Sequence, residues 1–276
     1  MNLPGIQLRH AVESWQGVGV FLDESHLPAC DRKELAFWQA DPRYNRSSPF
    51  WENLKVKAGE LRMFEDLLPR IGARPGERIL ELGAGQGWAS AMLKHDHPGC
   101  EVHASDVSPE ALLGAQKWEQ LLGARLDGLW ACQADHTPFA DAQFDCIFTF
   151  AAFHHFAIGN RDRAALAECF RLLRPHGRLV LLAEPTAPAW LHGWAKRKLD
   201  AIRSRSGFDI EEDVLVPGRL ARAASGLGAR MRVDFDTSWS WREIRLPGVI
   251  RSAIVRRVPA LGWIVPIGAH ITFTRG

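Results

Sequence analysis

The stretch RILELGAGQGWAS, residues 78–90, constrains the fold of this chain more than any other segment. An apolar run typical of a buried strand leads directly into glycines at 83, 85 and 87, and a helical pattern follows. Glycines placed there permit a tight turn and let a ligand approach the backbone closely. Strand, glycine loop and helix in this order indicate an open α/β sheet, in which ligands lie at the carboxyl ends of the strands.

The loop excludes two common ligands and favours a third. A phosphate-binding loop needs GxxxxGK[ST], and this loop has no such lysine. A dinucleotide loop needs GxGxxG, but Trp88 occupies the place of the last glycine. Glu81, just before the glycines, would repel a pyrophosphate and attract an ammonium group. Asp106 and Asp135 end the next two predicted strands, where acids can accept ribose hydroxyls and face an adenine amino group. The pattern therefore indicates a ligand with an amine, a ribose and an adenine.

Strand and helix patterns alternate along the middle of the chain, which predicts a parallel sheet covered by helices on both faces. The expected strands are 78–83, 100–106, 128–135, 144–152, 177–185, 229–238 and 268–276. The expected helices are 50–72, 88–97, 108–124 and 162–175, the third capped by Ser108 with Pro109 at its first position.

Five segments together resemble the class I S-adenosylmethionine-dependent methyltransferases. They are ELGAGQG (81–87), SDVSPEAL (105–112), AD (134–135), FDCIFTFAAFHHF (144–156) and RLLRPHGRLVLLAEP (171–185). The resemblance implies an α/β, Rossmann-like sheet of seven strands in the order 3-2-1-4-5-7-6, the last one antiparallel, with helices on both faces. It also implies S-adenosylmethionine as the cofactor. The chain then divides into an N-terminal helical cover, 1–70, and a methyltransferase domain, 71–276, with a substrate-side insert at about 239–267.

The resemblance also assigns residues to each part of the cofactor. For the methionine end it implies Glu81, Gly83, Ala84, Gly85 and Gly87. For the ribose, the adenine and the sulfonium it implies Asp106 with Val107, Asp135 with His136, and Phe150 with Ala151, respectively.

Two residues are candidates for a general base, which methyl transfer needs only where the nucleophile must lose a proton. His155 is the first candidate and Glu184 the second, and a purely structural role stays open for each. Candidate substrate residues are Tyr44, His154, Trp239 and Trp263. No metal site is expected, because the cysteines at 30, 100, 132, 146 and 169 lack paired spacing, and such a set is typical of reduced thiols.

The acceptor is expected to be a small organic or lipid-like molecule. The place after the fourth strand reads FAAF (150–153), without the NPPY or DPPY of resembling nucleic-acid amino-methyltransferases, so no nucleic acid is expected. The aromatic N-terminal cover and the Trp-rich insert are typical of the walls of a small-molecule pocket. A catalytically inactive scaffold of the same fold, a nucleotide-dependent oxidoreductase and an aminopropyl transferase remain alternatives.

Charge is distributed unevenly along the chain. Residues 1–189 carry 19 basic and 24 acidic side chains, whereas residues 190–276 carry 15 and 8. This basic end suits an acidic substrate, a membrane surface or nucleic acid, or is simply a solvated surface. Proline at 259 and 266 interrupts the uncharged run that precedes Arg275, so no spanning helix is expected there. Arginines 251, 256 and 257 scatter around a helical wheel, which does not indicate a clean amphipathic membrane helix.

The N-terminus lacks a basic start followed by an apolar run, so we expect a cytoplasmic protein. Peripheral membrane contact and the oligomeric state are left open by the sequence.

Overall fold

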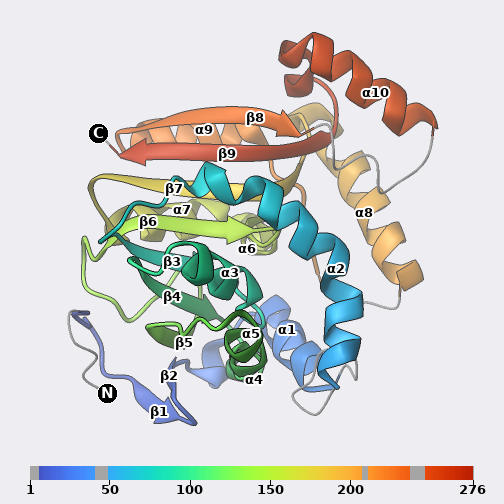
Figure 1. Cartoon of the computed structure of the whole chain (residues 1–276). Helices are drawn as coiled ribbons and strands as arrows, with labels where there is room; N and C mark the ends of the chain where they lie inside the picture. Colours follow the sequence, from blue (N-terminus) through green and yellow to red (C-terminus); the bar gives the residue numbers. More distant parts are fainter. Residues whose placement is uncertain (1–5, 41–48, 207–210, 237–245, 276) are drawn as a thin grey trace.

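One mixed sheet forms the centre of the molecule (Figure 1). The computed structural model describes residues 6–40, 49–206, 211–236 and 246–275. Within them the strand order is β1-β2-β5-β4-β3-β6-β7-β9-β8. The strands are β1 (Glu13–Trp15), β2 (Val18–Phe21), β3 (Arg78–Leu82), β4 (Glu101–Asp106), β5 (Gly128–Cys132), β6 (Phe144–Phe150), β7 (Leu173–Thr186), β8 (Ala229–Asp236) and β9 (Ile267–Arg275).

The strand order predicted from the sequence is confirmed for the seven strands that follow residue 77. Strands β5, β4, β3, β6 and β7 pair in parallel. Strand β9 then inserts antiparallel between β7 and β8. Numbered from β3, this is the order 3-2-1-4-5-7-6 with a reversed last strand.

The N-terminal cover differs from the prediction, because part of it is a β-hairpin that raises the strand number from seven to nine. Gln16 and Gly17 form its two-residue turn with φ of 50° and 90°, the left-handed conformation that such turns require. Strand β2 continues the sheet by pairing in parallel with β5. The strands have only three and four residues, which is too short for a periodic signal in the sequence.

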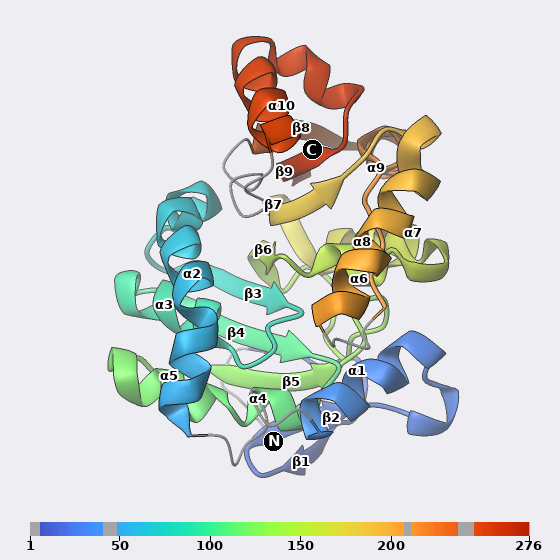
Figure 2. The same cartoon turned by 90° about the vertical axis from the view of Figure 1, so that its right-hand side faces the viewer.

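Helices cover both faces of the sheet, as predicted. The helices are α1 (Ala29–Ala40), α2 (Phe50–Leu67), α3 (Trp88–Asp96), α4 (Pro109–Leu112), α5 (Ala115–Leu122), α6 (Phe153–Phe156), α7 (Asp162–Leu172), α8 (His192–Ser206), α9 (Pro217–Gly226) and α10 (Leu246–Arg257). Short 3-10 helices are η1 (Glu24–His26), η2 (Leu68–Ile71), η3 (Ile158–Asn160), η4 (Ala189–Leu191) and η6 (Pro259–Trp263). Helices α1, α2, α8 and α10 stand around the side of the molecule that faces the viewer in Figure 2.

The core has two layers because neighbouring strand residues point to opposite faces of the sheet. Ile79 packs with Phe64 of α2 and Trp88 of α3 on one face. Leu80, the next residue, packs with Leu166 of α7 and Leu220 of α9 on the other. Burial on both sides explains the continuous apolar runs in the parallel strands.

The helix predicted over 108–124 is in fact two helices, α4 and α5. Ser108 caps α4 as predicted, since its side chain accepts a hydrogen bond from the Ala111 amide at 3.2 Å. The chain breaks at Gly114, whose amide bonds to the Ala111 carbonyl at 2.9 Å. A Cβ at Gly114 would lie 3.0 Å from Cγ of Gln86, so the missing side chain lets the glycine loop pack here.

The insert contributes α10 and η6, while its first residues lie outside the described ranges. Across the part of the chain that the structure describes, we find no helix with the length and apolar character needed to cross a bilayer.

Candidate functional site

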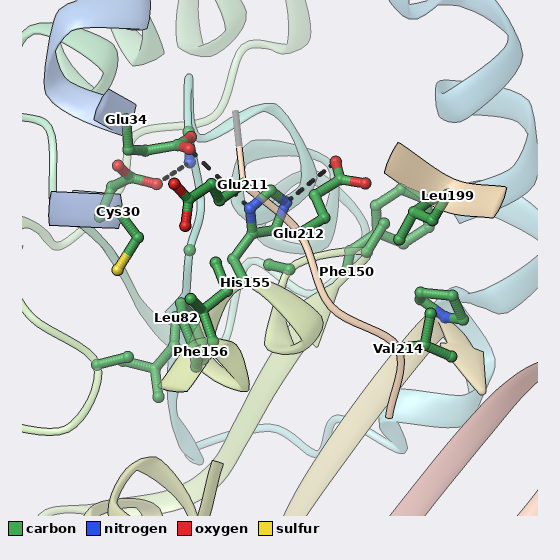
Figure 3. Close-up of a pocket in the computed structure, with 18 of the residues that line it drawn as sticks. Cys30, Glu34, Leu82, Phe150, His155, Phe156, Leu199, Glu211, Glu212 and Val214 are labelled. Carbon is green, nitrogen blue, oxygen red and sulfur yellow. Dashed lines mark hydrogen bonds and ion pairs between the residues drawn. The ribbon is translucent and has the colours of Figure 1, made fainter. Parts of the chain in front are cut away.

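A cavity of about 1170 Å³ opens at the carboxyl ends of β3, β4, β5 and β6. The glycine loop and the ends of the strands form one wall, and helices α1, α2 and α8 form the others. Figure 3 shows how side chains from these distant segments converge. The position agrees with the general rule for ligand sites in open α/β sheets.

The glycine loop passes close to its neighbours in a backbone conformation that favours glycine. Gly83 and Gly85 have φ of 72° and 53°. A Cβ on Gly83 would lie 2.7 Å from Cβ of Ala152, and one on Gly85 would lie 3.0 Å from the Trp38 ring. Both the turn and the packing therefore depend on the absence of side chains.

Glu81 places a carboxyl group in the cavity wall beneath this loop. It is 2% exposed and accepts a hydrogen bond from the Ser90 hydroxyl at 2.5 Å. Burial raises the pKa of Glu81 to about 8, even though the Ser90 bond opposes the shift. A ligand ammonium group would supply the positive charge that favours the ionised form.

Asp106 ends β4 beside the same loop and lines the cavity. Its two oxygens accept amide hydrogen bonds from Gly85 at 2.8 Å and Ser108 at 2.9 Å. Burial raises the pKa of Asp106 to about 6, against the effect of these amides. Val107, which follows, also lines the cavity.

Asp135 lines the cavity but is engaged in an ion pair. Arg161 donates to both oxygens of Asp135, at 2.8 and 2.7 Å, and also to Asp31 of α1 at 2.9 Å.

His136, which was expected beside Asp135 at the adenine, lies elsewhere. The His136 ring is exposed and packs against Phe21 of the hairpin at 5.2 Å. The structure does not bring His136 into the cavity, because the turn after β5 points it toward β2.

Phe150 ends β6, Ala151 follows it, and both line the cavity. Ala151 has φ of 49°, and its amide bonds to the Leu182 carbonyl of β7 at 2.8 Å. The bond holds this turn against β7, directly before the histidine pair.

His155 lies in the cavity between two carboxylates (Figure 3). Its Nε2 is 3.6 Å from Glu212, and its Nδ1 is 4.0 Å from Glu34 of α1. Glu34 also accepts a hydrogen bond from the Trp38 indole at 3.0 Å. Burial raises the pKa of Glu34 to about 8, and the negative charge of Asp106 adds to the effect.

His154 faces the other way and is almost fully buried. Its Nδ1 donates to Glu184 at 2.8 Å, and its Nε2 lies 3.9 Å from Glu212. Burial alone would lower the pKa of His154, but the bonds to Glu184 and Glu212 outweigh it and raise the pKa to about 9. The predicted contact between His154 and substrate is therefore not what this geometry favours, since both ring nitrogens face carboxylates.

Glu184 was the second candidate for a base, and the structure gives it a different place. A bulge in the β7–β9 pairing, between Leu181 and Glu184, precedes it. The carboxylate is completely buried and accepts five hydrogen bonds. The donors are the Thr149 hydroxyl, the amides of Ala152, Phe153 and His154, and the His154 ring. Burial alone would raise the pKa of Glu184, but these bonds keep it below its usual range. Because Glu184 has these partners and does not line the cavity, it stabilises the turn after β6 and is not placed to accept a proton from a substrate.

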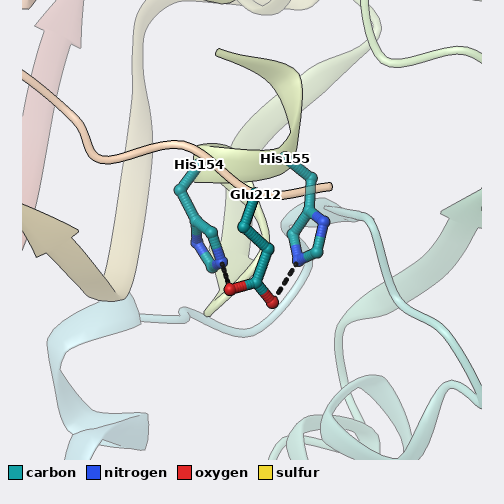
Figure 4. A group of neighbouring side chains, drawn as sticks. All are labelled: His154, His155 and Glu212. Carbon is teal, nitrogen blue, oxygen red and sulfur yellow. Dashed lines mark ion pairs between the residues drawn. The ribbon is translucent and has the colours of Figure 1, made fainter. Parts of the chain in front are cut away.

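Together with Glu212, the two histidines are the residues that could hold a metal ion in the described part of the chain (Figure 4). One ligand atom from each lies within 4.8 Å of the others. A metal would compete with the proton that His154 holds, because only the deprotonated nitrogen is a ligand.

The expected substrate residues are placed apart from one another. Tyr44 and Trp239 lie outside the described residues. Trp263 is 44% exposed on η6 and packs against Phe235 at 5.7 Å, away from the cavity wall. The insert reaches the cavity through Arg251, Pro266 and Ile267 instead.

Several cavity residues were missed by sequence reasoning. They are Asp31, Glu34, Trp38, Gln133, Arg161, Lys198, Glu212 and Arg251. Only Gln133 and Arg161 lie within the resembling stretch, and no motif marks either. The others come from helices and loops outside it, where folding alone brings them to the site.

Comparisons with known proteins agree with this geometry. A family model described as a methyltransferase domain matches residues 80–181. The demethylmenaquinone methyltransferase of Thermus thermophilus is 32% identical over 164 residues, which cover 58% of this chain and 70% of that protein. The UbiE ubiquinone/menaquinone biosynthesis C-methyltransferase of Bordetella avium is 34% identical over 127 residues, which cover 44% and 48%.

A solved structure extends the likeness across nearly the whole chain. The geranyl diphosphate C-methyltransferase of Streptomyces coelicolor, in complex with Mg²⁺, geranyl diphosphate and S-adenosyl-L-homocysteine, superposes with a TM-score of 0.62 at 13% identity. The match covers 90% of this chain and 98% of that one. At this identity it bears on the fold alone.

The position of Glu184 predicts a loss of stability when its charge is removed. Glu184→Gln replaces a buried carboxylate that pairs with His154, and one amide oxygen cannot accept all five bonds. We expect the free energy of unfolding to fall by about 3–5 kcal/mol, as for breaking other buried pairs. Guanidinium denaturation followed by circular dichroism measures this, with exposed Glu65→Gln as the control. Equal stability of the two variants would contradict the role.

Proposed function

Because the chain belongs to the class I S-adenosylmethionine-dependent methyltransferases, we propose that it methylates a small, lipid-like acceptor in this cavity. One observation carries the proposal. A single cavity joins a polar end, with Glu81, the glycine loop and Asp106, to apolar side chains from α2 and α8. Cofactor and acceptor can therefore meet inside one cavity.

The polar end of the cavity would bind the cofactor in one orientation. Glu81 would face the ammonium group of the methionine part, and Asp106 the ribose hydroxyls. Asp135 stays an adenine neighbour in this proposal, because each of its oxygens keeps a lone pair after bonding to Arg161. The sulfonium would then lie near Phe150 and Ala151, which border the space beside His155.

The remaining space suits an acceptor with an apolar body. Its walls include Val56 and Met63 of α2 and Leu199 and Ile202 of α8, and Val214 lies on the same side as Leu199 in Figure 3. Such walls exclude water from the reacting atoms and favour burial of hydrocarbon. This apolar character supports a lipid-like acceptor over a small charged one.

His155 is the residue we propose as the base. Methyl transfer from a sulfonium is a direct displacement, so the enzyme must chiefly align donor and acceptor at about 3–3.5 Å. A hydroxylated aromatic acceptor becomes a strong nucleophile when its hydroxyl loses a proton. His155 would take this proton, and the carboxylate of Glu212, 3.6 Å from its Nε2, would stabilise the resulting imidazolium. The names of the quinone-methylating relatives make a hydroquinone with an apolar tail the first acceptor to test.

Two assays test the proposed function. Calorimetry should detect binding of S-adenosylhomocysteine and no binding of NADH. Binding of NADH without binding of S-adenosylhomocysteine would favour an oxidoreductase. In the second assay, the protein is incubated with S-adenosylmethionine and one of three acceptors, which are demethylmenaquinol, geranyl diphosphate and phosphoethanolamine. Mass spectrometry then shows which acceptor is methylated. We expect product with demethylmenaquinol. Cofactor binding without product from any apolar acceptor would favour the inactive-scaffold alternative.

The pKa of Asp106 predicts how cofactor affinity depends on pH. The ionised carboxylate is the form that accepts ribose hydroxyls, and it is lost as the pH falls through about 6. Loss of this carboxylate should lower the affinity for S-adenosylhomocysteine by up to about tenfold per pH unit below 6, separately from any change near pH 8, where Glu81 ionises. Asp106→Asn should bind at least tenfold more weakly at pH 7.5, because bonds to a charged group contribute about 1.5–3 kcal/mol each. Calorimetry from pH 5 to 8 decides this, and an unchanged affinity in a folded variant would refute the assignment.

Replacement of His155 should slow the reaction without removing the cofactor. We expect His155→Ala to lower kcat by about 10²–10⁴-fold, the usual contribution of a general base. Its affinity for S-adenosylhomocysteine should stay within threefold of the native value, and the rate should rise with pH as hydroxide replaces the base. His97→Ala, on the far end of α3, is the control. A loss of rate that keeps the native pH profile would indicate a structural role.

A further inference from the structure

Exposed apolar side chains gather on the elements around the cavity mouth. Ten of the twelve large hydrophobic residues that are exposed in the described chain lie on α2, η4, α8, α10, η6 or directly after α10 and η6. They are Trp51, Val56, Trp190, Trp194, Ile202, Ile250, Ile254, Val258, Trp263 and Ile264. Only Leu121 and Leu227 lie elsewhere. A concentration of this kind marks an interaction surface.

Helix α10 presents an outward apolar face that the sequence did not reveal. Ile250 and Ile254 are 50% and 46% exposed, and Val258 at the end of the helix is 48% exposed. Their spacing of four residues puts them on one face. Ser252 and Val255 are buried on the opposite face. The helical wheel gave no clean amphipathic pattern because this helix carries apolar residues on both its inner and its outer face.

Positive charge accompanies the apolar residues. Helix α8 contains five basic residues and one acidic residue, while α10 and η6 together contain three arginines and no acid. Arg197, Arg256 and Arg257 are exposed, and none of them forms an ion pair with another described residue. Lys198 lies over the Trp194 ring at 4.2 Å. The surface is therefore both apolar and cationic.

Helices α8 and α10 both lie on the right-hand side of Figure 1, and in Figure 2, which views that side, α10 stands above α8. Both also reach into the cavity wall, α8 through Trp194, Lys198 and Ile202, and α10 through Arg251. A molecule that leaves a bilayer beneath these helices would enter the cavity without crossing water.

We propose that this α8–α10 surface, formed by η4, α8, α10 and η6, docks on a bilayer that contains anionic lipid. Tryptophans and aliphatic side chains would enter the interface, and the unpaired basic residues would meet the lipid headgroups. A second copy of the chain fits less well, because a two-fold contact would bring this positive surface against itself. The inference rests on the proposed function for its purpose, the supply of a lipid-like acceptor.

Vesicle sedimentation tests the proposal without any acceptor. The full chain should bind vesicles of phosphatidylcholine with 30% phosphatidylglycerol, and should bind pure phosphatidylcholine at least tenfold more weakly. Raising the salt concentration should weaken the binding, because the headgroup attraction is screened. Absence of binding to anionic vesicles would overturn the proposal.

Matched variants identify the surface. Arg256→Glu with Arg257→Glu, and separately Ile250→Ser with Ile254→Ser, should each lower the partition coefficient at least tenfold. The controls are Arg125→Glu with Arg230→Glu and Leu121→Ser with Leu227→Ser, which change exposed residues elsewhere. An equal loss in the controls would overturn the assignment. So would sedimentation equilibrium in which the first two variants abolish a dimer but keep vesicle binding.

Activity separates this inference from the proposed function. The surface variants should keep the native affinity for S-adenosylhomocysteine and the native rate with an acceptor dissolved in detergent, but lose rate with the acceptor in vesicles. Vesicle binding without methylation of any acceptor would refute only the proposed function. Methylation in detergent without vesicle binding would refute only the docking surface.

Discussion

The buried carboxylate of Glu184 organises the catalytic end of this molecule. Five hydrogen bonds tie it to the end of β6, to the first amides of α6 and to the His154 ring. A negative charge at the start of a helix is favoured by the unpaired amides there. These bonds set the direction of α6. They therefore also set the position of His155, which lies on the same short helix. A residue outside the cavity therefore decides where the proposed base stands within it.

The cavity brings together several carboxyl groups whose ionisation is disfavoured by burial. Burial raises the pKa of Glu34 and Glu81 to about 8 and that of Asp106 to about 6. A buried carboxylate is stabilised chiefly by nearby positive charge and by donors. S-adenosylmethionine carries an ammonium and a sulfonium, so its binding would offset the electrostatic cost of ionising these carboxyl groups. Asp31 and Asp135, by contrast, already pair with Arg161.

Local reasoning succeeded where one segment contains all the partners of an interaction. The glycine loop, Glu81 and the Asp106 position follow from a strand, a turn and a helix that are close in sequence. It failed for His136, which packs against β2, and it left Glu184 open between a base and a structural role, which its neighbours in the turn after β6 distinguish. It also failed for the hairpin β1–β2, whose short strands are stabilised mainly by pairing with β5. In each of these cases the deciding contact joins residues far apart in the chain.

The sequence by itself determined the alternation of strands and helices, the strand order implied by the family resemblance, and the cofactor loop. Backbone sterics and burial on both faces of a parallel sheet leave few other arrangements for such a pattern. Only the tertiary structure decided that Glu34 and Glu212 flank His155, that Arg161 pairs with Asp135, and that α8 and α10 both contribute residues to the cavity wall. The physical reason is that charge pairing and side-chain exposure depend on distances in space, and segments that are separated in sequence set those distances only when the whole chain has folded.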